Sequence, residues 1–237
     1  MCLLNLNELK KTIRANANKD HAKTMQWFFK TGKGEYGEGD KFVGIKVPVQ
    51  RKISRQFGEL DLEDLQTLLN SIIHEERLIS LLILVAKYEK ADEKVKEKIY
   101  HFYKKNRRKI NSWDLVDLSA PKIIGIHLLN CDKQILYKYA HSNNLWEKRI
   151  SIISTYSFIK NHDFKTTLEI SDILLNDDHD LIHKAVGWML REVGKQDPKT
   201  LEKFLKPRYN KMPRTMLRYS IEKFPEKKRK KYLKGKI

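Results

Sequence analysis

A tryptophan and an aspartate stand four residues apart in the segment Asn111-Ser-Trp-Asp-Leu-Val-Asp117. Asn111 and Ser112 are residue types that favour the N-cap of a helix, so we expect a helix to begin at Trp113. Trp113 and Asp117 then lie on one face of that helix. An indole face attracts a cation, and a carboxylate stabilises developing positive charge and orients or deprotonates water.

The same segment also has a purely structural interpretation. Trp113 would then be a core residue, and an aspartate in the first turn would compensate the helix dipole. Asp114, at the second helical position, is best assigned to that structural role. The segment alone therefore leaves both interpretations open.

Amphipathic helical patterns recur along the chain, and strand-like alternation is scarce. Residues 60–69 form one such pattern, with Asp61 as its expected N-cap. Three further apolar faces are Leu78, Leu81, Leu82, Val85 and Ala86; Ile150, Ile152, Ile153, Tyr156 and Ile159; and Ile182, Ala185, Val186, Met189 and Leu190.

The helical patterns also repeat. The segment around Arg77 matches the segment around Arg149, and their separation equals two units of about 36 residues. The midpoint falls at Trp113, and further steps reach Ala185 and the region of Leu217. A period near 36 to 40 residues is in the range of HEAT, armadillo or TPR arrays. We predict an all-α, HEAT-like (ARM-type) helical repeat solenoid with a basic concave face, forming a single domain over residues 1–237.

This repeat extends the candidate site beyond one helix. If Trp113, Arg149 and Trp188 lie one unit apart each, equivalent helices bring them to one face of the solenoid. A carboxylate would then be flanked by two indoles and an arginine. Arg149 would bind a phosphate, because a guanidinium group matches phosphate oxygens bidentately.

Net charge is the strongest global signal. The chain carries 48 lysines and arginines against 30 aspartates and glutamates, which gives a net charge of +18. Such a balance favours a polyanion as partner, whether DNA, RNA or an anionic membrane surface. A lysine-rich proteome encoded by an A/T-rich genome would produce the same composition.

Other features limit the range of functions. Cys2 and Cys131 lack any metal-ligand or CxxC spacing, which indicates a reducing compartment. The opening residues have too short an apolar run for a signal peptide, and no stretch approaches a membrane span, so we expect a cytoplasmic protein. The eight histidines show no paired ligand spacing, so no metal and no cofactor is predicted.

Two segments depart from the helical pattern. Residues 31–40 hold four glycines and must form a loop. Their acidic residues would repel phosphate, so this loop is not a phosphate cradle. The lysine-rich run over residues 226–236 is interpreted as a solvated helix end or tail.

The sequence resembles the DNA alkylation repair proteins of the AlkD type, which are HEAT-like-repeat DNA glycosylases. Four segments, together spanning the chain from about residue 25 to 220, carry the resemblance, and their combination is specific. They are Phe28-Phe-Lys-Thr-Gly-Lys-Gly-Glu-Tyr-Gly-Glu-Gly-Asp-Lys-Phe-Val-Gly-Ile-Lys-Val-Pro48, Asn111 to Asp117, Trp146-Glu-Lys-Arg149 and Lys184-Ala-Val-Gly-Trp-Met-Leu-Arg-Glu192.

The resemblance implies a monofunctional hydrolase of N-glycosyl bonds that acts on duplex DNA. Its expected reaction is excision of cationic N3- and N7-alkylpurines without rotating the damaged base into a protein pocket, unlike most glycosylases. Asp117 would be the catalytic carboxylate, Trp113 and Trp188 would pack on the deoxyribose of the lesion, and Arg149 would hold the nearby phosphate. The substrate is implied by the resemblance and not by composition or spacing.

The resemblance also implies further DNA contacts. Lys184 and Arg191, in the same motif as Trp188, are predicted to contact DNA. An aromatic DNA contact is expected near the end of the first helices, where the family's usual tyrosine is absent, and both Trp27 and Phe28 are candidates. The expected protein is a monomer without a membrane partner.

Two other classes of function remain open from the sequence. Members of the superfamily that lack the carboxylate can be non-catalytic DNA binders, so the chain could bind DNA or branched and distorted DNA structures without chemistry. A protein–protein adaptor is the commonest use of helical repeats, but it would leave the charge and the indoles without a role. Lesion preference and activity on RNA are not determined by the sequence.

Overall fold

Helices account for most of residues 5–237, the part of the chain that the computed structural model describes. Within this part, the one extended pairing is an isolated parallel β-bridge between Lys41 and Ile73. The predicted all-α class is confirmed. Cys2 lies outside the described residues, and Cys131 is an exposed free thiol.

Contacts within the chain divide it into two compact units, with the boundary after Ser119. The expected single domain over residues 1–237 stays a prediction, and each unit is described by itself. The first unit contains the Trp113–Asp117 segment, and the second contains Arg149 and Trp188.

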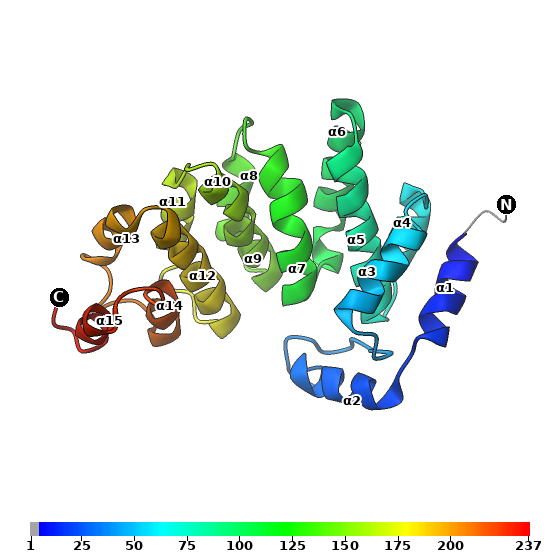
Figure 1. Ribbon diagram of the computed structural model, residues 1–237, viewed down its shortest axis with the longest axis horizontal. Helices are drawn as coiled ribbons and strands as arrows, with labels where there is room; N and C mark the ends of the chain where they lie inside the picture. Colours follow the sequence, from blue (N-terminus) through cyan, green and yellow to red (C-terminus); the bar gives the residue numbers. More distant parts are fainter. Residues whose placement is uncertain (1–4) are drawn as a thin grey trace. The chain divides into compact units, whose positions relative to one another are not determined.

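In the first unit, a group of helices runs side by side, and α2 runs across their ends (Figure 1). Helix α5 packs against both α3 and α4. The elements are α1 (Leu6–Ala15), α2 (Lys19–Phe28), α3 (Val47–Gln56), α4 (Leu62–Leu69), α5 (His74–Lys90), α6 (Glu93–Asn106), the 3₁₀ turn η1 (Arg107–Lys109) and α7 (Trp113–Ala120), which ends at the unit boundary.

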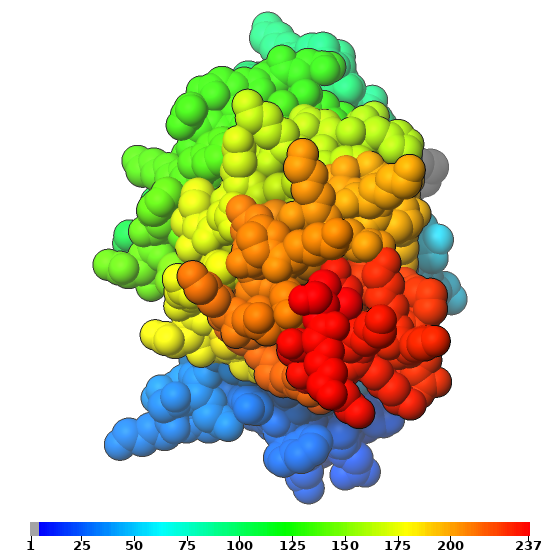
Figure 2. Space-filling model, turned by 90° about the vertical axis from the view of Figure 1, so that its left-hand side faces the viewer, coloured from blue at the N-terminus to red at the C-terminus, as the bar shows by residue number. Residues whose placement is uncertain are grey.

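In the second unit, α9 packs against both α8 and α12, and α12 packs against α14. Helices α13, α14 and α15, in orange and red, form much of the surface turned toward the viewer in Figure 2. The elements are the π-helical turn η2 (Pro121–Gly125), α8 (Gln134–Ala140), α9 (Leu145–Ser154), α10 (Tyr156–Lys160), α11 (Lys165–Ile173), α12 (Asp180–Gln196), α13 (Pro198–Leu205), α14 (Arg214–Ser220) and α15 (Glu226–Leu233).

The predicted repeat corresponds to helices α5, α7, α9, α12 and α14, which begin roughly every 35 residues. Most residues of the three predicted apolar faces are buried, among them Leu78, Ile150 and Ile182. Leu82, Ala86 and Tyr156 are only half-buried, and the predicted face over residues 150–159 is divided between α9 and α10. The predicted helical repeat is therefore confirmed as a series of paired helices within each unit.

Both predicted helix starts are confirmed, but only one of them has a side-chain cap hydrogen bond. Asp61 caps α4 by accepting hydrogen bonds from the backbone of Glu63 and Asp64, both at 2.9 Å. Helix α7 begins at Trp113, yet neither the Asn111 Oδ1 nor the Ser112 Oγ has a hydrogen-bond partner.

The first turn of α7 uses a different side chain. Asp114 lies inside the helix, and its Oδ1 accepts a hydrogen bond from the Leu115 amide at 2.9 Å. The carbonyl of Ser112 accepts from the Val116 amide at 3.1 Å, so the backbone of Ser112 has the N-cap position without the side-chain bond.

The segment over residues 31–40 is a loop, as predicted. Its glutamates bind the backbone of the loop itself: Glu35 accepts from the Gly32 amide and Glu38 from the Gly34 amide, both at 2.8 Å. These two amides are therefore occupied by carboxylates. The lysine-rich C-terminal run forms α15, as expected for a helix end.

A buried contact positions α2 against the segment that leads into α3. Gly44 has a φ of +87°, and a Cβ atom there would lie 2.0 Å from the carbonyl oxygen of Asn18, the residue before α2. The fully buried Glu75 accepts hydrogen bonds from the amides of Val43, Gly44 and Ile45 at 2.8 to 3.2 Å. The carboxylate and the glycine together fix where α2 begins.

Replacement of Gly44 by alanine is expected to destabilise the first unit. The Cβ atom would collide with the backbone of Asn18 and Ala22, and Glu75 holds the Gly44 backbone in place. We therefore expect a loss of about 3 kcal/mol or more in the free energy of unfolding. Gly39→Ala is the matched control, because Gly39 also has a positive φ (+85°) but open space around it. Its expected loss is about 1 kcal/mol. Urea unfolding measures both, and equal losses would contradict the packing argument.

Candidate functional site

The first unit contains an aromatic cavity of about 490 Å³. Helices α2, α3, α5 and α7 and the segments next to them contribute its walls. The lining is almost wholly apolar and includes both Trp113 and Asp117. The lining residues are Thr24, Met25, Trp27, Phe28, Phe29, Phe42, Val47, Gln50, His74, Trp113, Asp114, Asp117 and Leu118.

Trp113 is held by two phenylalanines. Its ring stacks on Phe29, with centroids 4.9 Å apart and an interplanar angle of 6°. Phe28 meets the same indole edge-on, at 6.0 Å and 77°. Phe29 belongs to a small buried cluster with Ala22 and Phe42. The indole is therefore oriented by the core of the first unit and still borders the cavity.

The two candidates for the N-terminal aromatic contact differ in their surroundings. Trp27 is 81% exposed, and its ring makes no aromatic contact with another described residue. Phe28 is 56% exposed and packs on Phe29 and Trp113. Both border the cavity, but only Phe28 contributes to the packing that holds Trp113.

Two polar side chains stand out in this apolar lining. Asp117 lies one turn after Trp113 on α7 and is half-buried. Gln50 is buried, and its Nε2 donates to the Ile45 carbonyl at 2.6 Å, while its Oε1 has no hydrogen-bond partner. The cavity thus has a carboxylate and a buried acceptor on an aromatic background, where electrostatic attraction is stronger than in water.

Part of the cavity wall belongs to a buried charge network centred on His74. Its Nδ1 donates to Asp40 at 3.0 Å, and its Nε2 donates to Asp114 at 2.8 Å. Arg77 also donates to Asp40, at 2.6 Å. Phe42 stacks on the imidazole ring, with centroids 4.4 Å apart. The network joins the end of the loop over residues 31–40, α5 and α7.

The two aspartates keep this histidine protonated. Burial alone would lower the pKa of His74, but the charge of Asp114 and hydrogen bonds with both aspartates raise it to about 9. Burial would likewise raise the pKa of Asp40, but hydrogen bonds from His74 and Arg77 hold it below its usual value. An imidazolium between two carboxylates therefore orients the first turn of α7. Asp114 has the structural role expected from its position, whereas sequence reasoning missed His74.

In the second unit, Arg149 is buried on α9, and its Nη1 donates to the carbonyl of Leu181 at 2.6 Å. Lys184, on α12, forms an ion pair with Asp180 at 2.6 Å. The guanidinium group of Arg149 is thus fixed against the first turn of α12, one turn before Lys184.

Trp188 and Arg191 share one carboxylate on α12. The buried Glu192 accepts a hydrogen bond from Trp188 Nε1 at 3.1 Å, and it lies 3.6 Å from Arg191 Nε. Arg191 also pairs with Glu222. Tyr156 packs beside the indole of Trp188, with ring centroids 6.4 Å apart. These contacts fix the orientation of Trp188 within the second unit.

Whether Trp113, Arg149 and Trp188 share one face stays a prediction, and their positions along their helices differ. They do lie on successive repeat helices, but Trp113 is the first residue of α7, Arg149 is in the second turn of α9, and Trp188 is in the middle of α12. The helices are of unequal length, and each begins at its own cap, so a constant spacing in sequence does not give a constant position along the helix.

Two properties hold for residues 5–237. No three histidine, cysteine, aspartate or glutamate side chains come close enough together there to hold a metal ion. None of the helices in that range has the length and apolar character needed to cross a membrane.

A family model that covers most of the chain shows its family. A family model described as DNA alkylation repair enzyme matches residues 9–224. The solved structure of a predicted DNA alkylation repair enzyme from Enterococcus faecalis superposes with a TM-score of 0.69 at 16% sequence identity, covering 89% of this chain and 98% of that one. At this identity the superposition shows the shared fold alone. No curated protein matches the sequence.

The His74 network predicts a pH dependence of stability. The folded pKa of about 9 lies above the unfolded value near 6.5, so the stabilisation is complete below pH 6.5 and is lost as pH rises through 9. We expect the wild type to lose about 3 kcal/mol of unfolding free energy across this window relative to His74→Asn. His101→Asn is the control, because His101 is exposed on α6. Parallel curves for wild type and His74→Asn between pH 6.5 and 9.5 would refute the assignment.

Proposed function

Since the chain belongs to the family of DNA alkylation repair enzymes, we propose that it is a monofunctional DNA glycosylase that excises cationic N3- and N7-alkylated purines from duplex DNA. The observation that carries the proposal is Asp117 at the edge of an aromatic cavity beside a firmly held Trp113. This combination matches a reaction in which positive charge must be bound and then stabilised.

The chemistry of the alkylated purine explains why the proposed reaction needs few catalytic side chains. A purine alkylated at N3 or N7 already carries a positive charge, so its glycosidic bond is weakened and the departing base needs no protonation. The carboxylate of Asp117 stabilises the oxocarbenium-like transition state and directs water to C1′. The indole of Trp113 packs on the deoxyribose and favours a cationic neighbour.

The second unit contributes the remaining proposed contacts. Trp188 packs on the deoxyribose, and Arg149 binds the adjacent phosphate. Lys184 and Arg191 contact the DNA backbone. The hydrogen bonds of Trp188 to Glu192 and of Arg149 to the Leu181 carbonyl support these roles, because they hold both side chains in place before DNA binds. The proposal requires both units to contact the same stretch of duplex.

The proposed enzyme uses no metal or cofactor, acts as a monomer in the cytoplasm and leaves the damaged base within the duplex. The net charge of +18 supports duplex DNA as the partner, since phosphate neutralisation supplies most of the non-specific affinity.

The second candidate is a DNA-binding protein of the same fold without catalysis. The net charge favours it equally, because charge supplies affinity and not chemistry. It predicts tight, salt-sensitive binding to duplex or branched DNA with no base released from any alkylated substrate.

Asp117→Asn tests the reaction. We expect the variant to bind duplex DNA as the wild type does but to release 7-methylguanine and 3-methyladenine from methylated duplex at least about 100-fold more slowly under single-turnover conditions. The amide cannot stabilise the developing cation as a carboxylate does. Asp178→Asn, which removes an exposed carboxylate, is the matched control and should keep full activity. Wild-type rates in Asp117→Asn would exclude this mechanism.

Truncation of the two N-terminal aromatics separates a DNA contact from a packing role. Trp27→Ala should weaken DNA binding and leave the unfolding free energy within about 0.5 kcal/mol of wild type, because the indole packs on no other ring. Phe28→Ala should lower stability by about 1 kcal/mol and slow base release, because Trp113 loses its edge-on neighbour. Filter binding and thermal unfolding measure both, and the reverse pattern would assign the DNA contact to Phe28.

A further inference from the structure

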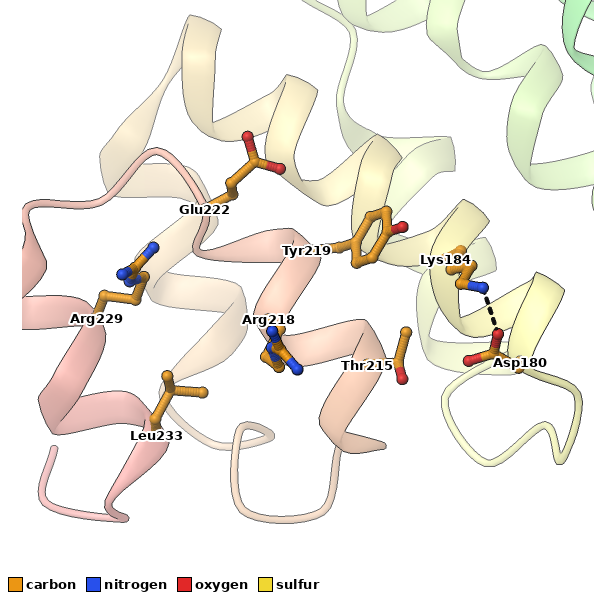
Figure 3. A pocket seen from close by; sticks show the side chains of 8 residues that line it. All are labelled: Asp180, Lys184, Thr215, Arg218, Tyr219, Glu222, Arg229 and Leu233. Atoms are coloured by element: carbon orange, nitrogen blue, oxygen red, sulfur yellow. Dashed lines mark ion pairs between the residues drawn. The ribbon is translucent and has the colours of Figure 1, made fainter.

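The second unit contains a charged pocket between α12, α14 and α15, with a volume of about 530 Å³ (Figure 3). Helix α12 contributes Asp180 and Lys184, α14 contributes Thr215, Arg218 and Tyr219, and α15 contributes Arg229. Most of these side chains are ionic or carry a hydroxyl group. We call this feature the arginine pocket.

Both carboxylates of the arginine pocket are already neutralised. Asp180 pairs with Lys184 at 2.6 Å, and Glu222 pairs with Arg191 and with Lys223, the latter at 3.2 Å. The hydrogen bond from Lys223 and the charge of Arg191 lower the pKa of Glu222, so it stays ionised and paired. The negative charges of Asp180 and Glu222 are therefore compensated by lysine and arginine side chains of the protein itself.

The two arginines have no such partner. Neither Arg218 nor Arg229 makes a side-chain hydrogen bond or ion pair with any residue between 5 and 237. Glu226 forms its ion pair with Lys230, which lowers the pKa of Glu226, and the positive charge of Arg229 lowers that pKa further without a hydrogen bond between the two. Figure 3 shows Arg229 on α15 and Arg218 on α14, so the two arginines line the pocket from different helices.

Two unpaired guanidinium groups that line one pocket attract an anion. Arginine presents a planar set of donors that matches the oxygens of phosphate, and Tyr219 adds a hydroxyl donor on the α12 side of the pocket (Figure 3). The volume exceeds what an isolated phosphate fills, so the phosphate can enter while still attached to its neighbouring sugars.

We propose that the arginine pocket binds a backbone phosphate of duplex DNA, with Arg218 and Arg229 as its ligands. The assignment of DNA as the source of the phosphate rests on the proposed function. The pocket lies wholly in the second unit and shares none of its lining residues with the aromatic cavity of the first. It therefore adds affinity without taking part in bond cleavage.

The first arm of the test uses inorganic phosphate at constant ionic strength. The side-chain NMR signals of Arg218 and Arg229 are assigned as those that disappear in Arg218→Gln and Arg229→Gln. Added phosphate should shift both signals in the wild type. Those shifts should saturate, while the signal of Arg55, an exposed arginine of the first unit, stays unchanged. Absence of a saturable response at both arginines overturns the pocket as a phosphate site.

The second arm uses an undamaged duplex with 5′-hydroxyl ends, so that internal phosphodiesters are the only phosphates. The double variant Arg218→Gln/Arg229→Gln should bind several-fold more weakly, with a slope of log affinity against log salt reduced by about 1. Lys206→Gln/Lys227→Gln removes the same charge from exposed positions outside the pocket and should change the slope less. Unfolding curves matching the wild type show that both variants are folded.

The outcomes separate this proposal from the proposed function. A saturable phosphate response together with unchanged DNA affinity and salt slope in the double variant would indicate an adventitious ion only, and would overturn the backbone assignment. A wild type that releases no alkylated base, but whose DNA binding depends on Arg218 and Arg229, would contradict the glycosylase and leave the pocket supported.

Discussion

The first unit depends on a buried imidazolium between two carboxylates. His74 joins Asp40, at the end of a glycine-rich loop, to Asp114, in the first turn of α7. Removal of the histidine would leave two buried aspartates close together with only Arg77 to compensate one of them, a loss of several kcal/mol by comparison with other broken buried pairs. The direction in which α7 leaves this network determines where Trp113 and Asp117 lie.

A continuous stack of rings leads from this charge network to the candidate site. Phe42 stacks on His74, Phe29 packs against Phe42 at 4.8 Å, and Trp113 stacks on Phe29. The network thus fixes the first two residues of α7: the carboxylate of Asp114 through hydrogen bonds, and the indole of Trp113 through the rings. A site that must hold a cation within a narrow geometry benefits from such support, because loosely held groups lose most of their electrostatic effect.

The sequence predicted the helices well because their signals are local. Apolar periodicity located the repeat helices, and Asp61 identified the start of α4 from the residues beside it. The His74 network could not be predicted in the same way, since its partners lie 34 and 40 residues away in sequence. Nothing near His74 distinguishes it from the seven other histidines. The arginine pocket was missed for the same reason, because Arg218 and Arg229 come together only when α14 and α15 fold.

The sequence match between the repeat helices is explained in part by buried charged residues and not only by a shared DNA-binding face. The matching segments around Arg77 and Arg149 both place a buried glutamate and a buried arginine near the start of a helix, where Arg77 binds Asp40 and Arg149 binds the Leu181 carbonyl. These buried charges satisfy neighbouring polar groups, so part of the repeat signal reports packing between helices. The remaining candidate residues differ between the units: a carboxylate beside an apolar cavity in the first, and cationic side chains in the second. A carboxylate in apolar surroundings attracts a cation more strongly than water would allow, whereas a neutral base gains nothing from it. Selectivity for cationic purines would then follow from Asp117 and its aromatic neighbours, with the basic surface supplying affinity that does not depend on the lesion.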